Sequence, residues 1–181
     1  MLLIGLPLLL VGFVIYRYSD SAADMHRVVQ AVPAAEKPIP PLAVNVFERL
    51  NTPGQRNIHV FRMIQEGLYE NGVVPQRNQL NWHLRSAVSA LLTPYRLSME
   101  EQATLVWGRI YFGGEAHGLR AGAKKYFNKT PQDLTEEEMV RLWVIALNPD
   151  GYDKDSAKFA DRIAWANRVW RGEQAAGTRK D

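Results

Sequence analysis

The strongest constraint on the fold lies between Arg109 and Pro149, where turn signals and helix signals follow one another closely. Two aromatic doublets, Tyr111–Phe112 and Tyr126–Phe127, bracket a Gly113–Gly114 turn and a stretch rich in Gly and Ala. Paired glycines permit a sharp turn with positive φ, and small residues let neighbouring helices approach closely. Doublets of this kind are more often core anchors than ligand contacts. The pattern predicts a closely packed helix between two aromatic anchors.

Helical signals continue through the rest of the chain. Ser98 with Glu101, and Thr135 with Glu138, have the spacing of capping boxes, in which each residue satisfies a backbone N–H of the other. Apolar residues recur at helical spacing, and no stretch shows the alternation of a strand. Pro94 is expected to end one helix. The sequence therefore predicts an all-α fold with helices over 58–70, 80–92, 99–110, 117–127, 135–147 and 156–170.

The N-terminus has a different character. Residues Leu2 to Tyr16 are uncharged, and Arg17 ends the run. As a helix this run would be roughly 24 Å long at ~1.5 Å per residue, and Tyr and Arg side chains at its end would extend its reach. We expect a transmembrane anchor over 1–18. A cleaved signal peptide is the alternative, although the run has neither a basic leading region nor a clear small-residue cleavage site. Arg17 and Arg27 leave the orientation open.

Four prolines fall within nine residues after the polar stretch that follows the anchor: Pro33, Pro38, Pro40 and Pro41. Proline-rich segments favour extended structure and exclude helix interiors. We therefore expect a linker over 19–41, a helical domain over 42–171, and a frayed tail over 172–181.

Composition limits the partners. The chain of 181 residues has a net charge of +3, a pI of about 9.2 and no cysteine. This balance suits an anionic partner such as a phospholipid or pyrophosphate surface, and no nucleic-acid motif is present. The absence of cysteine excludes thiolate sites, and His59, His83 and His117 lack the spacing of metal ligands. The sequence thus indicates neither nucleic-acid binding nor a zinc site.

The run YFGGEAHGLRAGAKKYFNKTPQDLTEEEMVRLWVIALNP resembles glycosyltransferase family 51, the peptidoglycan transglycosylase domain of class A penicillin-binding proteins and monofunctional transglycosylases. The typical family run is YFGxGxxGIxxAAxxYFGKxxxxLTxxEAAxLAxxxxxP. The resemblance covers 97–170 closely and 42–96 loosely. The matching positions are Tyr111, Phe112, Gly113, Gly118, Ala121, Ala123, Tyr126, Phe127, Lys129, Leu134, Thr135, Glu138, Leu142, Ala146 and Pro149.

The resemblance implies a lysozyme-like fold and a defined reaction. A sugar hydroxyl of lipid II attacks the anomeric carbon of the growing glycan and expels undecaprenyl pyrophosphate. A carboxylate acts as the general base, and cationic or amide groups stabilise the leaving pyrophosphate. The family takes the base from EDxxFxxHxG and the polar groups from GGSTITQQ and RKxxE. No cofactor is expected, apart from a divalent metal ion if the protein is active.

This sequence keeps little of those motifs. Glu48 stands at the position of the catalytic base, but Arg49 replaces the neighbouring Asp. The second motif falls on 56–63 and has neither Ser-Thr nor a Gln pair, and the third falls on 82–86. Arg62, Arg85 and Lys129 are the candidates to bind an anionic head group, because arginine binds phosphate with two parallel hydrogen bonds. The plainer interpretation is that these charges are solvated and that Glu48 is an ordinary surface residue.

Three functional hypotheses stay open. The first is a diverged, membrane-anchored transglycosylase with weak catalysis that uses Glu48 as base. The second is a pseudoenzyme of peptidoglycan biosynthesis that holds lipid II, a glycan strand or an envelope protein without turnover. The third is an unrelated helical domain of a membrane complex. The first two place the chain in the bacterial inner membrane, with a single span and a periplasmic domain.

Overall fold

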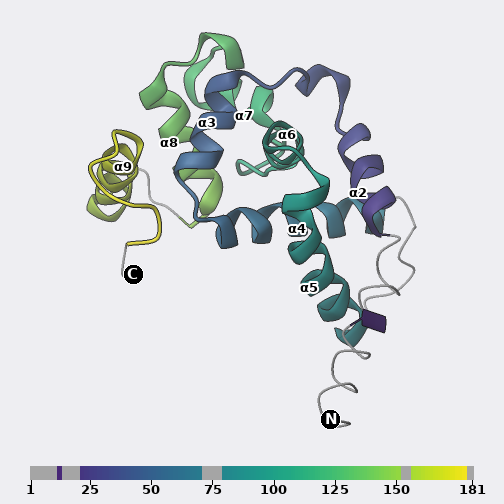
Figure 1. Ribbon diagram of the computed structural model, residues 1–181. Coiled ribbons are helices and arrows are strands. Elements are labelled where there is room, and N and C mark those ends of the chain that lie inside the picture. Colours follow the sequence, from purple (N-terminus) through teal and green to yellow (C-terminus); the bar gives the residue numbers. More distant parts are fainter. Residues whose placement is uncertain (1–11, 14–20, 71–78, 152–155, 179–181) are drawn as a thin grey trace.

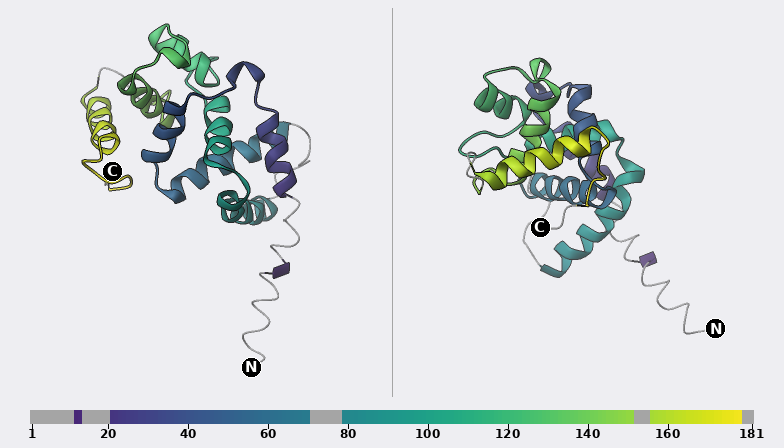
Figure 2. Two further views of the ribbon diagram at one scale, coloured as in Figure 1. Left: turned by 45° about the horizontal axis from the view of Figure 1, so that its top comes forward. Right: turned by 90° about the vertical axis from the view of Figure 1, so that its left-hand side faces the viewer.

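The computed structural model describes residues 12–13, 21–70, 79–151 and 156–178, and these residues are helical and irregular, without a strand. The all-α prediction is confirmed. A single isolated bridge joins Tyr111 to His117 among the described residues. The helices, shown in Figures 1 and 2, are α2 (Ser21–Gln30), α3 (Pro41–Arg49), α4 (Pro53–Glu70), α5 (Gln79–Arg96), α6 (Met99–Arg109), α7 (Leu119–Phe127), α8 (Glu136–Leu147) and α9 (Ala157–Trp170), with short 3-10 turns η1 (Ala34–Glu36) and η2 (Pro131–Asp133).

Helix α6 runs through the middle of the molecule, with α2 on one side and α3 on the other (Figures 1 and 2). Its Trp107 is fully buried and donates a hydrogen bond from Nε1 to the carbonyl oxygen of Ala43 at 2.9 Å. The Trp107 ring also lies 5.1 Å from that of Trp143 on α8, and Phe47 on α3 lies 5.6 Å from Trp143. These aromatic contacts join α3, α6 and α8 around one core.

Both predicted capping boxes are present. In α6 the Ser98 backbone N–H donates to the Glu101 carboxylate at 2.8 Å, and the Glu101 N–H donates back to the Ser98 hydroxyl at 3.2 Å. In α8, Thr135 and Glu138 make the same reciprocal pair at 2.8 and 3.2 Å. Such boxes satisfy backbone donors that have no partner within the helix. These two helix starts therefore agree with the sequence to within one residue.

Two helix limits differ from expectation. Helix α4 begins at Pro53, five residues before the expected start, because proline is well suited to the first helical position. Helix α5 continues past Pro94 to Arg96. Pro94 lacks an N–H to donate, and its ring crowds the carbonyl group of the preceding turn, but only two helical residues follow it, so the disturbance is confined to the end of α5.

The expected linker over 19–41 is wrong for its first half, because α2 belongs to the core. Met25, Val28 and Val29 of α2, with Val32 after it, are no more than 8% exposed. Their spacing puts the three helical residues on one face. Two glycines make room for this face: a Cβ added at Gly67 would lie 2.4 Å from Val28 Cγ1, and one at Gly108 would lie 2.4 Å from Val32 Cγ1.

The proline-containing segment after α2 is also fastened to the domain. The Glu36 carboxylate accepts a hydrogen bond from the Arg120 backbone N–H at 3.0 Å, at the start of α7. Arg120 Nε donates to the Ala35 carbonyl oxygen at 2.9 Å. Burial raises the pKa of Glu36, although the contacts with Arg120 oppose that rise. The segment therefore serves as a strap across the first turn of α7.

Two further expectations concern the ends of the chain. The expected anchor over 1–18 falls almost wholly outside the described residues, and no helix within them is long and apolar enough to cross a bilayer. The tail, expected to be frayed, folds back in turns as far as Thr178. Glu173 N–H donates to the Arg168 carbonyl oxygen at 2.9 Å, and Gln174 Nε2 donates to Thr178 Oγ1 at 2.8 Å.

Candidate functional site

The aromatic doublets fix the turn between α6 and α7. Phe112 is fully buried, and its carbonyl oxygen accepts a hydrogen bond from the Tyr126 hydroxyl at 2.7 Å. Lys125 Nζ donates to the same carbonyl oxygen at 3.2 Å and to that of Gly113 at 2.7 Å. Gly113 and Gly114 have φ of 86° and 60°, values that glycine adopts without strain. Phe112 is thus a core anchor, as predicted, and Tyr126 and Phe127 are partly buried against the core. Tyr111 is only partly covered, and its hydroxyl lies 3.4 Å from the Asp150 carboxylate. The sequence did not indicate the contacts of Lys125.

Lys129, predicted to bind an anion, is held by an acidic residue of the domain. Its Nζ lies 2.8 Å from both carboxylate oxygens of Glu138, the third residue of α8. This contact, helped by the Thr135 backbone N–H, keeps the pKa of Glu138 below its ordinary value. Lys129 thus connects the end of α7 to the capping box of α8.

Glu48, the predicted base, lies in the last turn of α3 with its side chain exposed. Ala43, Val46 and Phe47 occupy the buried face of this helix, so the helical repeat turns Glu48 outward. Its backbone carbonyl oxygen accepts a hydrogen bond from Arg56 Nη1 at 2.9 Å. This bond connects the end of α3 to the beginning of α4 and leaves the Glu48 carboxylate facing solvent.

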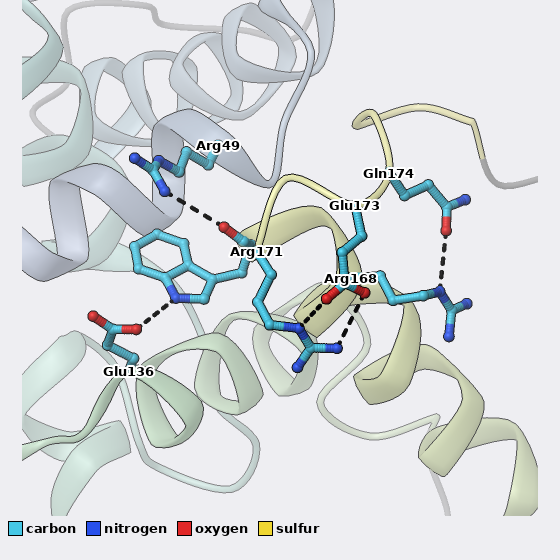
Figure 3. A network of polar contacts seen from close by, with 7 residues as sticks. Arg49, Glu136, Arg168, Arg171, Glu173 and Gln174 are labelled. Carbon is cyan, nitrogen blue, oxygen red and sulfur yellow. Dashed lines mark hydrogen bonds and ion pairs between the residues drawn. The ribbon is translucent and has the colours of Figure 1, made fainter.

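The neighbouring Arg49 points toward the end of α9 (Figure 3). Its guanidinium carbon lies 5.0 Å from the centre of the Trp170 ring, and Nη1 lies 3.4 Å from the Trp170 carbonyl oxygen. Trp170 Nε1 in turn donates to the Glu136 carboxylate at 2.9 Å. The residue that replaces the family's Asp therefore joins α3 to α9, and Trp170 joins α9 to α8.

Helix α4 places Arg62 on the surface one turn after His59. The His59 ring packs edge-on against Trp143 with centroids 5.3 Å apart. Burial, assisted by the positive charge of Arg62, lowers the pKa of His59 to about 4. His59 is therefore a neutral core-facing residue at neutral pH, whereas the Arg62 side chain faces solvent.

The three predicted site residues whose side chains the structure describes, Glu48, Arg62 and Lys129, do not form one cluster of direct contacts. Glu48 is on α3, Arg62 is on α4, and Lys129 follows α7. Arg85 lies on α5, and its side chain is outside the described residues. Over the described ranges, no hydrogen bond or ion pair joins Glu48, Arg62 and Lys129, and no group of three or more His, Asp or Glu side chains could hold a metal ion. These residues do not fit a divalent metal site.

Comparison with known families decides the relationship. The family model described as Transglycosylase matches residues 64–171, which is more than half of the chain. The chain belongs to the transglycosylase family. In this transglycosylase-family protein, residues 64–171 contain the aromatic doublets, both capping boxes, Arg85 and Lys129. Glu48 and Arg62 precede the matched residues. A comparison with curated proteins found no match.

Proposed function

We propose that this transglycosylase-family protein binds lipid II or nascent glycan strands at the periplasmic face of the bacterial inner membrane, with weak or no polymerisation of its own. The carrying observation is the loss of motif residues that catalysis needs: Arg49 stands where the family has an acidic residue, and residues 56–63 contain neither the Ser-Thr nor the Gln pair of the second motif. The Arg49–Trp170 contact supports the same conclusion, because it joins helices at a position where the family has an acidic partner of the base.

The expected chemistry is demanding. A general base must take the proton of the attacking hydroxyl while cations stabilise the leaving pyrophosphate. Each such electrostatic group is typically worth ~2.7–4 kcal/mol of transition-state stabilisation. Glu48 is the only acidic residue left from the first motif, and the Ser-Thr and Gln residues of the second are replaced. Binding without efficient turnover is the function that these residues favour.

Membrane attachment is part of the proposal. The uncharged run from Leu2 to Tyr16 supports an anchor, and α2 begins only a few residues after it. Since α2 packs in the core, such an anchor would hold the domain close to the bilayer, where lipid II is found. This arrangement suits a protein that binds a lipid-linked sugar.

Labelled lipid II tests the proposal. The full-length protein should bind lipid II in detergent micelles, whereas the same preparation should release little or no polymer. Glu48→Gln should leave binding intact, with Glu115→Gln, an exposed residue of the turn before α7, as matched control. Rapid wild-type polymerisation that Glu48→Gln abolishes would instead establish the diverged enzyme. Absence of binding to lipid II and to glycan strands would contradict both.

A second candidate function, an envelope protein that binds a protein partner, is favoured by the exposed apolar residues of α5. Leu91 and Tyr95 are 54% and 81% exposed and lie one turn apart on the same face. A photo-crosslinking residue at position 95 tests this function in cells. A discrete protein adduct that Leu91→Ser removes would favour the partner-binding role, while labelling of lipid alone would contradict it.

A further inference from the structure

A hollow of about 250 Å³ lies between α9 and the tail that follows it. This volume is below the ~300–1,000 Å³ of pockets that enclose drug-sized ligands. It suits part of a short peptide, with the rest in solvent, or one small head group. Its lining comes from one face of α9 and from the tail: Asp161, Ala164, Trp165, Arg168 and Gln174.

The hollow has opposite charges at its two ends. Asp161 and Arg168 are seven residues apart on α9, so two helical turns put them on the same face. Both side chains are exposed, and no ion pair joins them in the part of the chain that the structure describes. Arg171 is paired directly with the Glu173 carboxylate and lowers its pKa, and Arg168 is near enough to help. Because the direct pair of Glu173 is with Arg171, Asp161 and Arg168 can still face a ligand that carries both signs.

Arg168 is held in place from the tail. Its Nε donates to Gln174 Oε1 at 3.2 Å, and Figure 3 shows the side chain extending away from Arg171 toward Gln174. Gln174 is itself fixed through Nε2 to Thr178 Oγ1 at 2.8 Å. The Nε bond orients the guanidinium and leaves its two terminal nitrogens to donate to a carboxylate.

The lining between Asp161 and Arg168 is apolar, apart from the indole N–H of Trp165, which has no hydrogen-bond partner within the described residues. Trp165 is 7% exposed, and its Nε1 is buried. One face of its ring is covered by the Arg162 guanidinium, whose carbon lies 5.1 Å from the ring centre. The buried Trp165 side chain therefore offers little ring surface to a sugar, and the two charges of the lining favour a charged peptide over a carbohydrate.

We infer that this hollow binds a short peptide that carries an ammonium and a carboxylate, with the ammonium at Asp161 and the carboxylate at Arg168. The peptide stem of lipid II has this chemistry, so the inference deepens the proposed function and rests on it for the identity of the ligand. The hollow would then hold the stem on α9, while the sugar and lipid contact other parts of the domain.

Calorimetric titration of the full-length protein with a synthetic Nα-acetyl-L-Ala–γ-D-Glu–L-Lys–D-Ala–D-Ala peptide, in which the lysine side chain carries the single ammonium, tests the site. We expect Asp161→Asn and Arg168→Met each to weaken binding about fivefold at low salt, as for a partly exposed ion pair. Lys158→Met, an exposed charge on the same helix outside the lining, is the matched control and should bind as the wild type does. Melting temperatures identify any variant that fails to fold.

Acetylating the free lysine amine of the peptide identifies the ends of the ligand. The acetylated peptide should bind the wild type about fivefold more weakly, and Asp161→Asn should then cause no additional loss, because the same ion pair is already absent. Folded Asp161→Asn and Arg168→Met variants that bind the free peptide as tightly as the wild type would overturn the inference. So would a wild type that does not bind the peptide.

The two proposals fail differently. If both hollow variants bind intact lipid II as the wild type does, the peptide site is wrong while the proposed function stands. If the wild type binds the free peptide through Asp161 and Arg168 but neither lipid II nor glycan strands, the hollow is a real site and the proposed function is wrong.

Discussion

The Arg49 guanidinium lies over the Trp170 ring at 5.0 Å, although 121 residues separate the two in the chain. This contact places the C-terminal end of α9 against the last turn of α3, beside Glu48. The position of α9 is therefore coupled to the end of α3, which carries the proposed base Glu48.

Arg49→Met should loosen this coupling. The substitution keeps an unbranched apolar chain but removes the cation and its donor, at a cost of about 1 kcal/mol. Hydrogen exchange should accelerate at the end of α9 more than at α6. Arg96→Met, an exposed arginine at the end of α5, is the control and should change neither. If hydrogen exchange at the end of α9 is the same in Arg49→Met as in Arg96→Met, the hydrogen bond to Glu136 is enough to hold Trp170 without Arg49.

Gly67→Ala and Gly108→Ala should each destabilise the domain by about 1–3 kcal/mol, because the new methyl group meets Val28 or Val32. Chemical denaturation measures the loss. The matched control is Gly54→Ala in α4, where a Cβ meets nothing within 4 Å, and it should be neutral or stabilising by up to about 1 kcal/mol. Val28→Ala removes the methyl groups that the new side chain at position 67 would meet, so the double variant should lose less stability than the sum of the two single variants. If the two losses in free energy of unfolding add, Gly67 and Val28 do not lie in close contact.

His59 should make the domain sensitive to acid. Its pKa is about 4 in the folded chain and ordinarily 6.5, so the unfolded chain binds a proton first as the pH falls. Stability is then lost between about pH 6.5 and 4, by an amount on the order of 3 kcal/mol, since each pKa unit corresponds to about 1.4 kcal/mol. His59→Phe keeps an aromatic ring beside Trp143 and should flatten this part of the stability profile. His117→Gln should keep the wild-type slope, and an unchanged slope in His59→Phe would show that other groups cause the loss.

Lys129→Met should lower the melting temperature at neutral pH through the loss of the Glu138 pair. The folded pKa of Glu138 is lowered, so this stabilisation is present above its unfolded pKa and disappears as the pH falls through the folded value. The difference in melting temperature between wild type and variant should therefore shrink in acid. Lipid II affinity should change little. A large loss of affinity with unchanged stability would assign Lys129 to substrate binding.

Two N-terminal deletions separate an anchor from the core. Removing residues 1–20 should release the protein from membranes and keep a cooperative melting transition, because α2 is retained. Removing residues 1–32 also deletes Met25, Val28, Val29 and Val32, and should abolish that transition. Circular dichroism follows both. Loss of cooperative melting in the shorter deletion would place the first twenty residues in the core.

Most of the helices could be predicted from the sequence, because a capping box and the spacing of apolar residues depend only on residues three or four positions apart. The sequence does not predict α2, although Met25, Val28 and Val29 have helical spacing, because the four prolines that follow favour an extended segment over 19–41. The Glu36–Arg120 strap and the Arg49–Trp170 contact join distant residues, and no local pattern predicts which groups will meet. For the same reason sequence alone could not show that Glu138 neutralises Lys129.

The burial of α2 has a consequence for how this protein would encounter its ligand. A membrane-spanning segment that ends near Ser21 would leave the domain almost no tether, so the domain could neither swing far from the membrane nor rotate freely. Its search would be confined to the plane of the bilayer, and lateral diffusion of both partners would set the rate of encounter. A lipid-linked sugar fits that geometry, while a glycan strand farther into the wall would have to come down to the membrane to be bound.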